Sequence, residues 1–131
     1  MQAIYSKLNK KSIETDPIDV ALDAMKQDSA LVPLTCGLEV ANVIARAEAK
    51  GLVTEARSGI FLEMLADMDI DVDMATWAHA LTDTLQLARR YKLSSYDASY
   101  LELALRLGKP LATLDEDLQK AAKKAGVKKF S

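Results

Sequence analysis

Three carboxylates in apolar surroundings are the residues of this sequence best suited to chemistry. Glu39 lies in the segment LEVAN, Asp97 in SYDAS and Asp115 in LATLD. An isolated buried carboxylate shifts its pKa or finds a partner, and three brought together would repel one another unless a cation held them. The set therefore predicts a divalent metal site. Carboxylates and a metal, with almost no histidine, suit phosphodiester chemistry.

The composition limits the kind of protein this chain can be. Its 131 residues, half of them hydrophobic, are enough for one domain over residues 1–131 with a real core. Cys36 is the single cysteine, so we expect no internal disulfide, a buried thiol and a reducing cytoplasm. No apolar run approaches the roughly 18 residues that span a bilayer, and the N-terminus lacks a signal-peptide core. We therefore predict a cytoplasmic protein with no membrane contact.

The remaining polar residues exclude other classes of site. His79 is the single histidine, so zinc catalysis and a Ser-His-Asp triad are poorly supported and a structural role is favoured. A net charge of -2 argues against a basic nucleic-acid coat. Lysines nevertheless gather near both ends, either as solvated helix faces or as phosphate contacts: Lys7, Lys10, Lys11, Lys120, Lys123, Lys124, Lys128 and Lys129.

Hydrophobic spacing predicts helices that alternate with short strands. Helices are expected from Pro17 onward and over 34–50, 54–66, 74–91, 95–108 and 116–125, and strands over 30–32, 69–73, 111–114 and 127–130. This alternation implies a parallel α/β sheet, in which sites form at the carboxyl ends of the strands. Asp115 falls at such an end, Glu39 lies about two turns into the helix 34–50, and Asp97 opens a helix. All three can therefore converge at one edge.

The helix over 34–50 carries two stripes and is expected to be mostly buried. One stripe is apolar and comprises Leu34, Leu38, Ala41 and Ala45. The other is polar and comprises Thr35, Glu39, Asn42 and Arg46. Its spacing puts Glu39 in line with Asn42 on one face.

Each acid also has a purely structural explanation. Glu39 could pair with Arg46, Asp97 could be an ordinary helix-start acid, and Asp115 could cap the last helix. Asp117 is more simply a solvated acid in the first turn of that helix. Spacing alone therefore does not establish a site.

In combination and in order, several motifs of the chain resemble a PIN domain, most closely the bacterial VapC-type toxins. The segments that carry the resemblance are 33–42, 93–104, 110–115 and 118–126, within a match over roughly residues 17–130. The resemblance implies a three-layer α/β/α sandwich with a short parallel sheet, and a Mg²⁺- or Mn²⁺-dependent endoribonuclease. Glu39, Asp97 and Asp115 match three of the family's acidic metal ligands.

Further roles follow from the same resemblance. Asn42 and Thr113 are expected to orient ligands or substrate, and Asp117 is a candidate for contact with the metal's outer shell. The implied partners are RNA, with tRNA as one candidate, and a cognate antitoxin that masks the site.

The chain departs from the family at its N-terminus. Family members begin with a central strand that ends in another metal-binding Asp, and counting back from Pro33 places Ala3 to Leu8 at the start of the helix that follows this strand. Glu14 and Asp16 fall too late to replace that Asp. We therefore expect an N-terminally truncated domain whose sheet lacks the first central strand, with a metal site one carboxylate short and weak or absent activity.

The expected gap in the sheet leads to two alternatives. Unpaired edges and an exposed apolar face predict strand exchange or a homodimer. A catalytically silent PIN fragment that serves as a binding or dimerisation module is therefore the main rival to a ribonuclease. A metal-dependent phosphatase is a weaker rival, because it needs an aspartyl nucleophile motif at the end of the first strand and the sequence shows none.

Overall fold

The computed structural model describes residues 3–5 and 29–129 of the chain. Within them, four parallel strands form one sheet in the order β3-β2-β1-β4. The strands are β1 (Ala3–Tyr5), β2 (Ala30–Pro33), β3 (Ile70–Asp73) and β4 (Leu111–Ala112). The parallel α/β sheet expected from the sequence is thus confirmed.

Strand β1 lies between β2 and β4, and this position corrects the expectation of a missing central strand. Ile4 pairs with Leu31 of β2 and with Leu111 of β4. The prediction that a helix begins at Ala3 is therefore wrong for residues 3–5. The rest of that segment, and the helix expected from Pro17, lie outside the described residues. Three residues carry too little pattern to be recognised, because a strand this short is defined by the neighbours with which it pairs.

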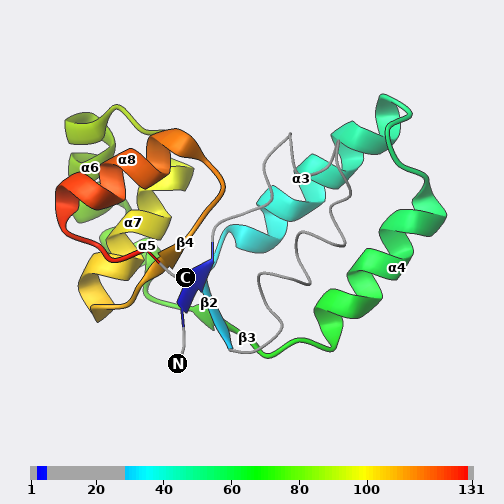
Figure 1. Cartoon of the computed structure of the whole chain (residues 1–131), viewed down its shortest axis with the longest axis horizontal. Coiled ribbons are helices and arrows are strands. Elements are labelled where there is room, and N and C mark those ends of the chain that lie inside the picture. Colours follow the sequence, from blue (N-terminus) through cyan, green and yellow to red (C-terminus); the bar gives the residue numbers. More distant parts are fainter. Residues whose placement is uncertain (1–2, 6–28, 130–131) are drawn as a thin grey trace.

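Helices connect and cover the strands (Figure 1). They are α3 (Cys36–Ala49), α4 (Glu55–Ala66), α5 (Thr76–His79), α6 (Leu85–Tyr91), α7 (Ser95–Leu107) and α8 (Glu116–Ala125). The helix predicted over 74–91 is interrupted by a π-helical segment, η1 (Ala80–Thr84). Of the strand predicted over 127–130, the described part shows one bridge, between Leu111 and Lys129. Helices α6, α7 and α8 gather on one side of the sheet, and α3 and α4 extend away on the other.

The helix ends follow from the capping residues in the sequence. The hydroxyls of Thr54 and Ser94 each accept a hydrogen bond from the N–H three residues later, at the starts of α4 and α7. Gly108 ends α7 with a φ of 63°, a left-handed conformation that glycine adopts without steric cost.

The main core lies between the sheet, α7 and α8. Its buried residues are Leu31, Tyr100, Leu101, Leu103, Ala104, Leu111, Leu118, Ala121 and Ala122. A smaller cluster joins α3 to α4, where Phe61 packs against Val40 and Ile44. Helix α7 is buried continuously from Ala98 to Ala104, so it is the central element of the main core.

Large apolar side chains are exposed on α3 and near α5. On α3, Leu38 is 77% exposed, whereas Glu39 beside it is buried. Near α5, Met74, Trp77 and Leu81 are 74%, 73% and 70% exposed. The expectation that the helix over 34–50 is mostly buried is therefore wrong, because its Leu38 side faces away from the core. No helix in the described part of the chain has the length and apolar character needed to cross a membrane.

Candidate functional site

The carboxyl ends of the four strands lie at one edge of the sheet, because all four run parallel. Helix α3 begins three residues after β2 ends at Pro33, and α8 begins four residues after β4 ends at Ala112. Glu39 and Asp115 therefore lie in the segments that follow this edge along the chain. At the end of β1 the sequence continues from Tyr5 to Ser6 and Lys7, so no acid stands at this point of the central strand.

A buried hydrogen bond between α7 and α3 holds the first of the candidate acids. The hydroxyl of Tyr100 donates to Oε1 of Glu39 at 3.2 Å. Tyr100 is completely buried, and Glu39 is 8% exposed. A carboxylate so removed from water needs polar partners. The placement of Glu39 in an apolar setting, expected from the sequence, is thus confirmed.

Cys36 belongs to the same cluster. Burial raises the pKa of its thiol, an effect that a hydrogen bond with Tyr100 partly offsets and the charge of Glu39 reinforces. Burial also raises the pKa of Tyr100, as do the neighbouring Cys36 and Glu39. The thiol and the phenol therefore stay protonated at neutral pH. Tyr100 acts as a donor to Glu39, and Cys36 has none of the thiolate character of a nucleophile.

Asp97 lies in the first turn of α7, where free N–H groups and the helix dipole favour an anion. Its backbone N–H donates to the hydroxyl of Ser94 at 3.1 Å. Asp97 and Tyr100 are three residues apart, so their side chains share one face of α7. Because the hydroxyl of Tyr100 donates to Glu39, the helix that carries Asp97 contacts α3 at Glu39, one turn after Asp97.

Asp115 is the N-cap of α8, the structural role that the sequence left open. Its Oδ1 accepts a hydrogen bond from the N–H of Leu118 at 2.9 Å. Its own N–H donates to Oγ1 of Thr113 at 3.1 Å, and Nε2 of Gln119 donates to the Thr113 carbonyl at 2.7 Å. Thr113 thus positions the turn that carries Asp115. Asp117 is exposed in the first turn of α8.

Asn42 lies on α3, one turn after Glu39, and is exposed. Its predicted role toward ligand or substrate therefore depends on what approaches this side of α3. The buried Glu39 carboxylate has a hydrogen-bond partner in Tyr100 and does not depend on the Asn42 side chain.

The three predicted ligands offer carboxylate oxygens, the donors that hard divalent cations take. Among residues 3–5 and 29–129, no three histidine, cysteine or acidic side chains are grouped to hold a metal ion. Mg²⁺ usually keeps several waters, however, and binds through only one or two carboxylates. Glu39 and Asp97 are the candidate pair for such a site. Asp115 already commits one oxygen to its helix cap.

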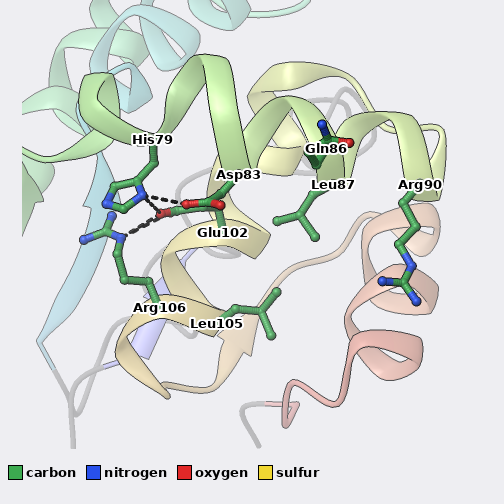
Figure 2. A pocket seen from close by; sticks show the side chains of 8 residues that line it. All are labelled: His79, Asp83, Gln86, Leu87, Arg90, Glu102, Leu105 and Arg106. Carbon is green, nitrogen blue, oxygen red and sulfur yellow. Dashed lines mark hydrogen bonds and ion pairs between the residues drawn. The ribbon is translucent and has the colours of Figure 1, made fainter.

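A separate group of charged side chains lines a pocket between η1, α6 and α7 (Figure 2). Nδ1 of His79 lies 2.9 Å from Asp83 Oδ2 and 3.5 Å from Glu102 Oε1. Arg106 donates from Nε to Glu102 Oε1 at 2.6 Å and from a terminal nitrogen to Asp73 Oδ2 at 2.5 Å. These contacts join α7 to β3 and η1, and they give His79 a structural setting.

Sequence reasoning missed Tyr100 and Arg106. The spacing of Tyr100 from Asp97 was a readable signal, since side chains at i and i+3 share a face. The pair Glu102 and Arg106, four residues apart on one helix, was another. The contact of Arg106 with Asp73 had no such signal, because 33 residues separate the two.

Comparison with known proteins places this geometry in context. A family model described as a PIN domain matches residues 4–124. Ribonuclease VapC3 of Pyrobaculum aerophilum is 34% identical over 80 residues, which are 61% of this chain and 61% of that protein. The match thus spans less than two thirds of that relative. Together these findings confirm the resemblance to VapC-type PIN domains.

A solved structure confirms the fold. The crystal structure of PAE2754 from Pyrobaculum aerophilum superposes with a TM-score of 0.65, over 92% of this chain and 87% of that one. At 19% identity this likeness concerns the fold alone.

Proposed function

This chain belongs to the PIN domain family, whose model matches residues 4–124, and on that premise we propose that it is a divalent-metal-dependent endoribonuclease of the VapC toxin type. The similarity to a protein named Ribonuclease VapC3 supports RNA as the substrate class. Mg²⁺ or Mn²⁺ is the proposed cofactor, because the candidate donors are carboxylate oxygens.

The observation that carries this proposal is the burial of Glu39, which accepts a hydrogen bond from Tyr100. Tyr100 lies one helical turn after Asp97 on α7. Glu39 and Asp97 would hold the cation, with Asp115 as the third acid of the site. A bound cation would supply an activated water and neutralise charge on the attacked phosphate. Asn42 and Thr113 would orient the ligands or the RNA, and Asp117 would contribute outer-shell contacts.

The proposal extends to partners and location. A cognate antitoxin would mask the site, and tRNA is one candidate substrate. We place the protein in the cytoplasm and propose that it forms a homodimer. The exposed side chains Leu38, Trp77 and Leu81 support the homodimer, because a monomer gains nothing from keeping them in water.

The test is cleavage of an end-labelled RNA in the presence of Mn²⁺, by the unmodified protein and by Asp97→Asn. We expect cleavage that depends on Mn²⁺ and falls at least a hundredfold in Asp97→Asn, on the order of the loss of a group that supports metal catalysis. Asp67→Asn is the matched control, because Asp67 is an exposed acid at the end of α4. Equal cleavage by Asp97→Asn and Asp67→Asn would contradict the assignment.

A second candidate is a catalytically silent binding or dimerisation module. Its support is now the lack of an acid at the end of β1, where Tyr5 is followed by Ser6 and Lys7, rather than a missing strand. This candidate predicts neither Mn²⁺ binding nor RNA cleavage by the unmodified protein. Gain of both in a Tyr5→Asp or Ser6→Asp variant would identify the lost carboxylate as the reason.

A further inference from the structure

Tyr100 has a hydroxyl in a place where an apolar side chain would serve the core better. It is completely buried, as are its helix neighbours Leu101 and Leu103. Burying a hydroxyl is unfavourable unless it finds a hydrogen-bond partner. The hydroxyl finds that partner across an element boundary, at Oε1 of Glu39. Its cost is thus offset by an interaction with a candidate site residue.

Tyr100 connects the helix that carries Asp97 to Glu39. Side chains of an α-helix lean toward its N-terminus, over the preceding turn. In α7 that turn contains Asp97. The Tyr100 side chain therefore leans over the turn that carries Asp97, and its hydroxyl donates to Glu39 of α3. The contact joins α7, one turn after Asp97, to α3 at Glu39.

A hydroxyl donor also restricts how a carboxylate can turn. The final torsion of a glutamate is broad, so its oxygens have little intrinsic preference for one direction. A hydrogen bond to Oε1 selects one orientation. Metal-binding carboxylates are often held in this way by groups that do not touch the metal.

We infer that Tyr100 is a positioning residue, whose hydroxyl holds the Glu39 carboxylate in the orientation in which it and Asp97 bind one divalent cation. This role rests on the proposed function. It is separate from the packing of the tyrosine ring, which Phe would preserve.

The experiment measures Mn²⁺ affinity by calorimetry, with the melting temperature recorded for each protein. We expect Tyr100→Phe to weaken Mn²⁺ binding about tenfold, the lower limit typical of such supporting residues. Tyr91→Phe is the matched control. It removes the same hydroxyl oxygen from a tyrosine that packs, partly buried, against the same core. Its affinity should be unchanged. Wild-type affinity in Tyr100→Phe would overturn the role.

A double-mutant cycle separates positioning from general destabilisation. Glu39→Gln keeps an oxygen that can accept from Tyr100 but removes the charge. In that background Tyr100→Phe should have no further effect on residual Mn²⁺ affinity if the tyrosine acts through Glu39. An equal loss in both backgrounds would overturn the inference.

A spectroscopic measurement needs no substitution at position 100. With 3-fluorotyrosine at all four tyrosines, Mn²⁺ should broaden the fluorine resonance of Tyr100, assigned by Tyr→Phe changes at the other three. A Tyr100 resonance that stays sharp at saturating Mn²⁺ would overturn the positioning role of Tyr100 but not the proposed metal site. Absence of any Mn²⁺ binding by the unmodified protein would overturn the proposed metal site and, with it, this role.

Discussion

At the scale of single residues, Asp115 shows how one carboxylate can serve the fold and still be a candidate ligand. Its Oδ1 accepts the N–H of Leu118, which satisfies one of the unpaired donors at the start of α8. Asn and Asp cap helices about equally well, whereas Ala does not. The negative charge and the cap can therefore be removed separately.

We predict that Asp115→Asn keeps the stability of the protein within about 0.5 kcal/mol, whereas Asp115→Ala lowers the free energy of unfolding by about 1 kcal/mol. Urea denaturation measures both. If the charge also serves the metal site, the two variants lose Mn²⁺-dependent RNA cleavage to the same extent. Full cleavage by Asp115→Asn would restrict Asp115 to its capping role. Equal stability of the two variants would contradict the cap itself.

The contrast between Glu39 and Tyr100 shows which site residues a sequence can reveal. Glu39 is recognisable because a charged residue in an apolar segment is costly and needs a reason. Tyr100 lies in an apolar run, where a tyrosine can serve in a core or at an interface without any role in a site. Its role depends on which residue faces it from α3, and that pairing is determined by tertiary packing.

At the scale of elements, α7 unites the core and the site. Its buried residues pack against the sheet and α8, its first turn carries Asp97, and Arg106 near its end reaches β3. Arg106 is paired with Glu102 and Asp73, whose side chains are only 6% and 12% exposed. Removing this cation would leave two carboxylates poorly solvated.

We predict that Arg106→Gln destabilises the protein by about 2 kcal/mol at pH 7, less than for a fully buried pair because Arg106 is 22% exposed. Urea denaturation of Arg106→Gln measures the change. Arg89→Gln is the control, since Arg89 is exposed on α6 and should change the stability by less than about 0.5 kcal/mol. Equal stabilities of the two variants would contradict the role of the ion pairs.

The same network gives the stability a pH dependence. Partial burial raises the pKa of Asp73, but the hydrogen bonds from Arg106, Ala75 and Thr76 and the charge of Arg106 outweigh it, so the net pKa is below its usual range. A lowered pKa in the folded state stabilises the protein above the unfolded pKa, about 3.9, and this contribution is lost as the pH falls through the folded value. The deficit of Arg106→Gln should therefore shrink below about pH 4. A deficit that is the same at pH 7 and pH 3 would contradict this linkage.

Elements with strong local signals were predictable, and those defined by distant partners were not. The boundaries of α4, α7 and α8 follow from Thr54, Ser94 and Gly126, which are recognisable caps. Strand β1 depends on pairing with β2 and β4, and the π-helical segment η1 interrupts a continuous helical pattern. Neither leaves a periodic trace in the sequence.

At the scale of the whole molecule, the reason to expect a dimer has changed. A central strand is present, so an open gap in the sheet no longer supports strand exchange. The exposed apolar side chains of Leu38, Trp77 and Leu81 support association instead. The N–H of Leu34 donates to Oγ1 of Thr76 at 3.0 Å, so the segment that leads into α3 contacts the first residue of α5. Leu38 and Trp77 thus lie on neighbouring elements.

We predict that the unmodified protein sediments as a dimer at about 10 μM, typical of a specific homodimer with a buried apolar interface. Replacing both Trp77 and Leu81 by Lys should yield a monomer with unchanged helical circular dichroism, because both side chains are at least 70% exposed and contribute little to the core. Leu107→Lys, an exposed apolar position at the end of α7, is the control and should remain dimeric. A monomer for the unmodified protein at every concentration would contradict the proposed homodimer. A dimer that survives both lysines would move its interface away from α5 and η1.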